Sequence, residues 1–185
     1  MFGLTHQWIW ILIALASVTG CSGLRLDAAP SRDVPLSGTW VVDSAASDDV
    51  GSAMRPDAKF GNRRQQMSTA AEIQRIRRGS GLAYVAHDFQ VLDAKRMRIE
   101  LDSDSMGIQH YPGIYRDVTW GIRERGIWKV QAGWDNDVLV VASKTRGINV
   151  LERYQLQGRS RLLVSLDIEA DGNVRSINRS FQRRR

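Results

Sequence analysis

The feature that constrains the fold most is a series of short alternating segments that begins near residue 96. In residues 96–104, Met97, Ile99 and Leu101 occupy every second position, and charged or polar side chains occupy the positions between them. Successive side chains of a strand point to opposite faces, so this pattern predicts a strand with one face in a core and the other in solvent. Further strands are predicted at short intervals, over residues 106–110, 114–118, 127–132, 138–143, 150–156, 162–168 and 174–181. Turn signals between them, such as Pro-Gly at 112–113, join antiparallel neighbours into a meander.

The chain before residue 96 adds one strand and one helix. Residues 36–43 alternate and are rich in β-branched side chains, which predicts the first strand. Apolar residues recur at helical spacing in residues 63–78, which predicts a helix, whereas residues 82–95 fit neither pattern clearly. We therefore expect a mainly β domain: an antiparallel meander barrel or sandwich of about eight or nine strands with one helix near residues 63–78. The segments predicted as strands are shorter than the ~9 to 11 residues of a membrane-barrel strand, so we expect a soluble barrel.

The first 20 residues have the character of an export signal. The apolar run over residues 8–18 is about half of the ~20 residues that a membrane-crossing helix needs. It leads into Val18-Thr19-Gly20-Cys21, which resembles the lipobox of bacterial lipoproteins. The resemblance implies a signal peptide over residues 1–20, a lipidated tether over residues 21–35 that begins at Cys21, and a single β-rich domain over residues 36–185. The chain lacks the Lys or Arg that usually precedes the apolar run, and the alternative is an unmodified Cys21 in an ordinary signal or a short buried helix.

The lipobox resemblance also implies a location and partners. A lipid anchor would hold the domain on a membrane of the bacterial cell envelope, facing the periplasm, where nucleic acid is not expected as a partner. Ser22 stands where an Asp would mark retention in the inner membrane, so the outer membrane is the expected address. The net charge of +6 is concentrated in residues 55–78 and 175–185, which suits an anionic envelope component. A solvated basic face is the alternative.

The first predicted strand contains Gly38-Thr39-Trp40, which is similar to the Gly-x-Trp signature of the lipocalin superfamily. In those proteins the tryptophan closes the base of the barrel beneath an arginine of the final strand, a role that Arg175 or Arg179 would take here. A guanidinium over an indole contributes about 0.5–2 kcal/mol. Residues 36–43, 104–109, 115–121 and 152–156 also resemble small secreted proteins of Gram-negative bacteria, a resemblance that implies no activity.

Tryptophans give the strongest remaining indication of a binding site. Four of them lie outside the signal: Trp40, Trp120, Trp128 and Trp134. Trp128, Val130 and Trp134 share one face of a predicted strand. They either fill the core or line a cavity for a small apolar ligand.

Catalytic and metal-binding motifs are absent from the sequence. It contains no zinc motif, nucleophile elbow, phosphate loop or dinucleotide fingerprint. We expect neither a metal nor a cofactor, and we assign no catalytic residue. The favoured function is that of a non-enzymatic envelope lipoprotein that binds a small apolar ligand or an envelope partner. The alternative is a hydrolase or isomerase that uses His110 or His87 with a nearby carboxylate.

Overall fold

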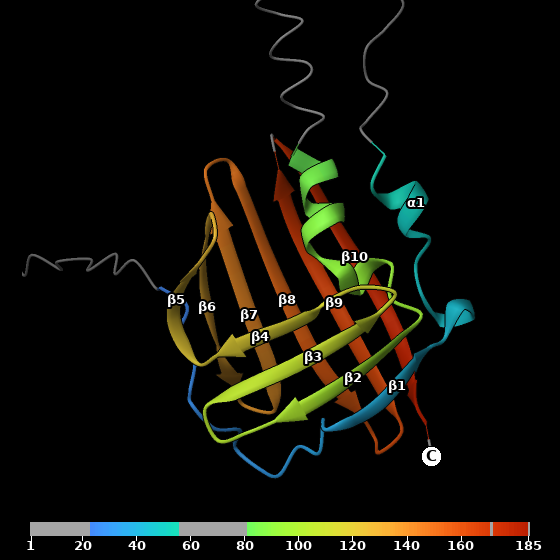
Figure 1. The fold of residues 1–185 in the computed structure, drawn as a ribbon, viewed down its shortest axis with the longest axis vertical. Coiled ribbons are helices and arrows are strands. Elements are labelled where there is room, and N and C mark those ends of the chain that lie inside the picture. Colours follow the sequence, from blue (N-terminus) through green and yellow to red (C-terminus); the bar gives the residue numbers. More distant parts are fainter. Residues whose placement is uncertain (1–22, 56–80, 171, 185) are drawn as a thin grey trace, which may run out of the picture.

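Ten antiparallel strands form one sheet that curls into a nearly closed barrel (Figure 1). The computed structural model describes residues 23–55, 81–170 and 172–184. The strands are β1 (Gly38–Val42), β2 (Arg96–Leu101), β3 (Ser105–Tyr111), β4 (Tyr115–Thr119), β5 (Gly121–Arg125), β6 (Trp128–Asp135), β7 (Val138–Thr145), β8 (Ile148–Gln157), β9 (Arg161–Ala170) and β10 (Asn173–Arg183). Their order is β4-β3-β2-β1-β10-β9-β8-β7-β6-β5. The predicted antiparallel meander is confirmed, and it forms a barrel.

The sheet has two ends, β4 and β5, which the single residue Trp120 connects. Within the described residues these two strands share no strand pairing, whereas every other pair of neighbours is hydrogen-bonded. In Figure 1 the two strands leave their common corner in different directions. We call this break in the backbone pairing the seam.

Alternation along the strands fills the inside of the barrel. In β9, Leu162, Val164, Leu166 and Ile168 are buried, and the residues between them are partly exposed. All four tryptophans outside the predicted signal are buried in this core: Trp40, Trp120, Trp128 and Trp134. The period of two that predicts the strands therefore also predicts most of the core.

One strand and several helical segments differ from the expectations. Strand β5 was not predicted, because all five of its residues are exposed and its alternation carries no apolar face. Residues 81–88 are helical and lead into a short 3-10 helix, η2 (Gln90–Leu92). Much of the segment 82–95, for which the sequence pattern was ambiguous, is therefore helical. Two further short elements, η1 (Ser44–Ala46) and α1 (Val50–Ala53), follow β1. The helix predicted over residues 63–78 and the lipobox with Cys21 lie outside the described residues.

Trp40 lies in the core where β1 pairs with β10. Its ring is fully buried, and its indole Nε1 donates a hydrogen bond to the carbonyl of Leu36 at 2.9 Å. The guanidinium of Arg183 lies 4.2 Å from the centre of the ring. Arg183 is the direct partner of Trp40 in the pairing of β1 with β10, which places both side chains on the same face of the sheet.

The prediction that Arg175 or Arg179 covers Trp40 is therefore wrong. Arg179 lies four positions before Arg183 on β10, which is about 13 Å along a strand. Its guanidinium donates to the carbonyl of Ala94. Arg175 lies further away still and donates to the carbonyl of Ala53, at the end of α1. The register of β10 against β1 places Arg183 opposite Trp40. The sequence pattern does not determine this register.

The segment before β1 is bound to the barrel. The backbone N–H groups of Asp27 and Trp134 each donate to the other residue's carbonyl at 2.8 Å, just past the point where β5 stops pairing with β6. A Cβ on Gly133 would meet the carbonyl oxygen of Asp27 at 2.7 Å, so this close approach requires glycine. Residues 24–32, part of the expected tether, thus lie along β6 and the turn that follows it. Among the described residues, no helix has the length and apolar character needed to cross a membrane.

Candidate ligand-binding site

A hollow of about 310 Å³ opens where β4 and β5 diverge, beside the helical residues 81–88. We call it the seam pocket. Its lining residues are Tyr84, His87, Asp88, Phe89, Gln90, Ile114, Arg116, Arg125, Gly126, Ile127, Trp128, Val130 and Ser143. The volume is at the lower end of the range for ligand cavities, so the seam pocket suits a small ligand.

The wall of the seam pocket is aromatic and centres on Trp128. Its ring lies 5.3 Å from that of Phe89 in an edge-to-face arrangement and 5.9 Å from that of Tyr84. Ile114 and Ile127 are both more than half exposed where they line the pocket. An apolar molecule would therefore meet apolar side chains both at the rim and inside.

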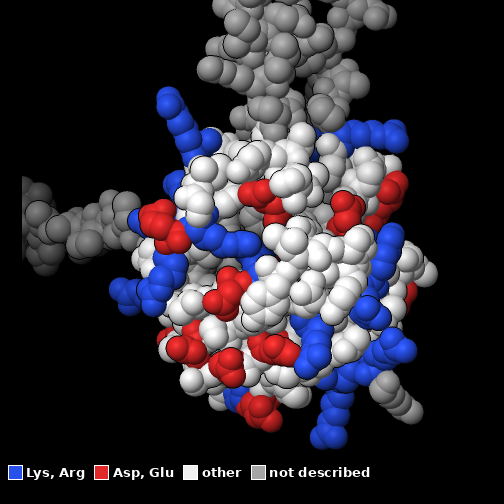
Figure 2. All heavy atoms as spheres, in the orientation of Figure 1, with Lys and Arg blue, Asp and Glu red and all other residues white. Residues whose placement is uncertain are grey.

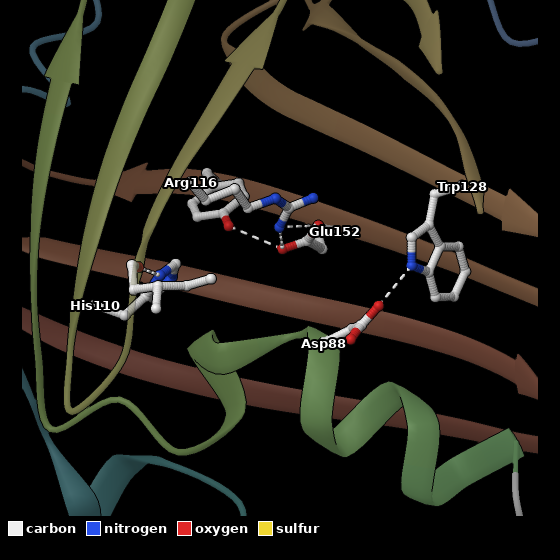
Figure 3. Close-up of polar contacts among 7 residues, drawn as sticks. Asp88, His110, Arg116, Trp128 and Glu152 are labelled. Atoms are coloured by element: carbon white, nitrogen blue, oxygen red, sulfur yellow. Dashed lines mark hydrogen bonds and ion pairs between the residues drawn. The ribbon is translucent and has the colours of Figure 1, made fainter. Parts of the chain in front are cut away.

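Asp88 holds the indole of Trp128 in place (Figure 3). The Nε1 of Trp128 donates to Oδ2 of Asp88 at 2.7 Å, and Nδ1 of His87 lies 3.0 Å from Oδ1. Partial burial acts to raise the pKa of Asp88, but the hydrogen bonds from Trp128 and His87 outweigh it and lower the pKa. Asp88 is therefore an anion at neutral pH.

The deepest charged group of the lining, Arg116 on β4, reaches the carboxylate of Glu152 on β8 (Figure 3). Its Nη1 lies 2.8 Å from Oε1 and 2.7 Å from Oε2 of Glu152, and the hydroxyl of Tyr154 donates to Oε1 at 2.9 Å. Burial acts to lower the pKa of Arg116, but the carboxylate of Glu152 outweighs it and raises the pKa. Burial raises the pKa of Tyr154 well above its ordinary value, with Glu152 adding to the effect. The cluster is thus a buried ion pair with a neutral phenol donor.

Two polar atoms of the lining are buried without a hydrogen-bond partner in the described part of the chain: Nε of Arg116 and Oγ of Ser143. Val141 of β7 pairs with Glu152 of β8, and Ser143 of β7 pairs with Val150 of β8. Ser143 and Glu152 are therefore diagonal neighbours on the inner face of the sheet. Diagonal neighbours of this kind are about 7–8 Å apart. Leaving such a group unsatisfied costs about 1–3 kcal/mol, which a ligand that bonds to it would recover.

The two histidines occupy different surroundings. His110 is 2% exposed; its Nδ1 lies 3.4 Å from the carbonyl of Ile114, and its Nε2 has no partner in the described structure. Burial lowers the pKa of His110, so the ring is neutral at pH 7. His87 is exposed at the pocket beside Asp88. The hydroxyl of Ser143 bonds to neither histidine in the described part of the chain, so Ser143 is not paired with a histidine base there.

Two other hollows are more polar. One of about 760 Å³ is lined by Arg32, Asp33, Asp137, Arg159 and Arg183, among others. One of about 450 Å³ lies between Arg96, Arg98 and Arg184 on the outside of the barrel. Several of these charges are already paired, as Arg32 is with Asp137 at 2.6 Å. Basic and acidic side chains are interspersed on the face shown in Figure 2. The seam pocket alone among the three combines an aromatic wall with buried unpartnered polar atoms.

Of the four tryptophans singled out in the sequence, only Trp128 lines the seam pocket, and the other three belong to the core around it. Sequence reasoning missed Asp88, Arg116, Ser143 and Glu152. No group of three or more His, Cys, Asp or Glu side chains in the described ranges is arranged to hold a metal ion.

The strand order gives a nearly closed antiparallel meander barrel, which fits a lipocalin-like fold, and the pocket opens at its seam. No protein-family model matches the chain, and no curated protein matches it either. Among solved structures, the chain is similar to the wild-type fluorescent protein UnaG, with a TM-score of 0.50 and 17% identity over 80% of this chain and 97% of that one. Two single-site variants of UnaG match with TM-scores of 0.48 and 0.49 at 16% identity. At this identity, the likeness to the wild-type protein shows a shared fold.

Proposed function

We propose that the protein is a non-enzymatic binding protein that holds one small apolar ligand in the seam pocket. The observation that supports this most is an aromatic pocket in a nearly closed barrel, with two buried polar atoms of its lining left without partners. Barrels of similar size hold one small ligand in lipocalins. Buried polar groups are normally hydrogen-bonded, so unpartnered ones in a pocket are suited to a ligand.

The neutral apolar fluorophore N-phenyl-1-naphthylamine tests this proposal with the full-length chain. We expect the fluorescence of the dye to rise on binding. Replacing Ser143 with Phe should weaken binding by about tenfold or more, because the ring would occupy the pocket. The matched control is Ser165→Phe, at a partly exposed position on β9, which should bind as the unaltered protein does. Equal dye affinity in the Ser143→Phe protein would show that the dye binds elsewhere.

We also propose that the protein is a lipoprotein of the bacterial cell envelope, anchored through Cys21 and facing the periplasm. The apolar run over residues 8–18 and the lipobox resemblance support this. Two lipid chains suffice for stable membrane anchoring. Ser22 supports the outer membrane rather than the inner one, and the net charge of +6 supports contact with anionic envelope components.

Replacing Cys21 with Ser should leave an uncleaved precursor in a Gram-negative host, because the lipid is attached to the thiol. The measurement is metabolic labelling with a radioactive fatty acid, combined with the electrophoretic mobility of the protein. A Ser22→Ala protein is the control and should be labelled and processed normally. Normal processing of the Cys21→Ser protein would refute the lipobox interpretation.

A further inference from the structure

We infer that a second binding site, on the outer face of the barrel, holds a phosphomonoester group between three arginines. The site is a hollow of about 450 Å³ lined by Thr39, Arg96, Arg98, Tyr111 and Arg184. We call it the arginine hollow. It shares no lining residue with the seam pocket, so it is independent of the ligand proposed there and of the anchor at Cys21.

Strand pairing places the three arginines on one face of the sheet. Thr39 of β1 is the direct partner of Arg98 of β2, and the backbone N–H of Arg184, just after β10, donates to the carbonyl of Thr39 at 2.8 Å. Neighbouring strands are about 5 Å apart, so Thr39 lies between the backbones of Arg98 and Arg184. Arg96 and Arg98 flank the fully buried Met97 on β2, so both arginines point outward. The register thus gathers three cations around one small side chain.

Few negative charges oppose these cations. Among the described residues that line the arginine hollow, none is Asp or Glu. In Figure 2, Lys and Arg side chains gather at the lower right, where β1 and β2 lie in Figure 1. The side chain of Arg98 lies 2.8 Å from Glu100, but both are more than half exposed. Solvent screens such a pair, so Arg98 can turn to a more highly charged anion.

The other two guanidiniums have donors to offer. Neither Arg96 nor Arg184 forms a side-chain hydrogen bond or ion pair with another residue of the described ranges. The guanidinium of Arg96 lies 4.2 Å from the centre of the ring of Tyr111, its partner in the pairing of β2 with β3. Stacking uses the face of the guanidinium and leaves its N–H groups to an acceptor. Arg96 is therefore positioned by Tyr111 without its hydrogen-bonding capacity being used.

This set of donors favours a phosphomonoester over a carboxylate. At neutral pH a phosphomonoester carries about 1.5–2 negative charges and three accepting oxygens. A carboxylate carries one charge and two oxygens in one plane. Guanidiniums that approach from β2 and from the end of β10 can each bond to a different oxygen of a tetrahedral group. Thr39 and Tyr111 add hydroxyl donors to the lining.

Methyl phosphate and acetate provide matched probes, because each joins one methyl group to the anion being compared. Nuclear magnetic resonance titration of the full-length protein, in low salt at neutral pH, should give an affinity for methyl phosphate about tenfold or more above that for acetate. The backbone amides of β1 and β2 should shift most. Equal or tighter binding of acetate, or no binding of methyl phosphate, would overturn the inference.

A protein with Arg96→Gln, Arg98→Gln and Arg184→Gln tests the site itself. Gln keeps an uncharged polar side chain at each position, and the loss of three guanidiniums should weaken methyl phosphate binding by about tenfold or more. Unchanged affinity in the folded triple variant would overturn the inference. If the triple variant does not fold, Arg184→Gln alone, which lies beyond the last strand, should still weaken binding, and unchanged affinity there would overturn the inference as well.

The matched control removes the same number of charges elsewhere on the barrel. Lys129 on β6, Lys144 on β7 and Arg146 in the turn after β7 are exposed, and all three are replaced with Gln. The control should bind methyl phosphate as the unaltered protein does. Equal losses in the two triple variants would show that only net charge matters, and the arginine hollow would not be a site.

Vesicles distinguish a lipid head group from a soluble phosphate as the source of the group. Phosphatidic acid carries a phosphomonoester, so we compare co-sedimentation with phosphatidylcholine vesicles that contain it and with those that do not. Binding that depends on phosphatidic acid and is lost in the arginine triple variant would support a lipid head group. Binding of methyl phosphate without such vesicle binding would support a soluble phosphomonoester in the same site.

Discussion

Replacing Trp40 with Ala is expected to lower the free energy of unfolding by about 3–5 kcal/mol. The indole is fully buried, its Nε1 donates a hydrogen bond to the carbonyl of Leu36, and the guanidinium of Arg183 covers its face. The substitution would therefore create a cavity and remove the aromatic surface beneath a cation. Urea-induced unfolding followed by circular dichroism would measure the change.

Val41 supplies the matched control for this experiment. It is the next residue of β1, and its side chain is 38% exposed. Val41→Ala should therefore change the free energy of unfolding by much less than Trp40→Ala does. A loss of less than about 1 kcal/mol in the Trp40→Ala protein would contradict the role of this residue in the core of the barrel.

Replacing Arg116 with Met should destabilise the protein by about 3–5 kcal/mol, because it leaves the fully buried carboxylate of Glu152 without its counter-ion. The double substitution Arg116→Met with Glu152→Gln removes both charges and keeps an acceptor for Tyr154. It should recover most of the lost stability, since buried ion pairs often contribute little in comparison with neutral replacements. Urea-induced unfolding of the two variants and of the unaltered protein would measure both changes.

Arg98 offers a comparison on the surface. It lies 2.8 Å from Glu100, with both side chains more than half exposed. Arg98→Met should change the free energy of unfolding by no more than about 1 kcal/mol, because solvent screens an exposed pair. Equal losses in the Arg98→Met and Arg116→Met proteins would show that burial of the Arg116 pair has no special energetic consequence.

The strands that the sequence predicts are those with an apolar face. Period-two alternation identifies nine of the ten, including β8 and β9, whose inward positions are nearly all apolar. Strand β5 was not predicted because its residues are exposed on both faces. It is held by backbone pairing with β6, which leaves no signature in side-chain polarity.

The candidate site was harder to predict for a different reason. Arg116 and Glu152 occupy inward positions of their strands, in phase with Val118 and Tyr154. Opposite charges at two inward positions are a recognisable signal for a buried pair, although the pattern alone does not say which strands face each other. The position of Arg183 over Trp40 likewise depends on the register of β1 with β10. Register is a tertiary property that a single strand's pattern does not contain.

The seam has a consequence for how quickly a ligand can exchange. Elsewhere in the barrel, parting two neighbouring strands would break a ladder of backbone hydrogen bonds. Between β4 and β5 there is no strand pairing to break, and the seam pocket opens there beside Tyr84, Ile114 and Ile127. Side-chain rotation takes picoseconds to nanoseconds at exposed positions, whereas unfolding of a sheet is far slower. Release of a bound molecule would then be governed by its own contacts with the wall, so its residence time would report the affinity of the pocket and not the stability of the barrel.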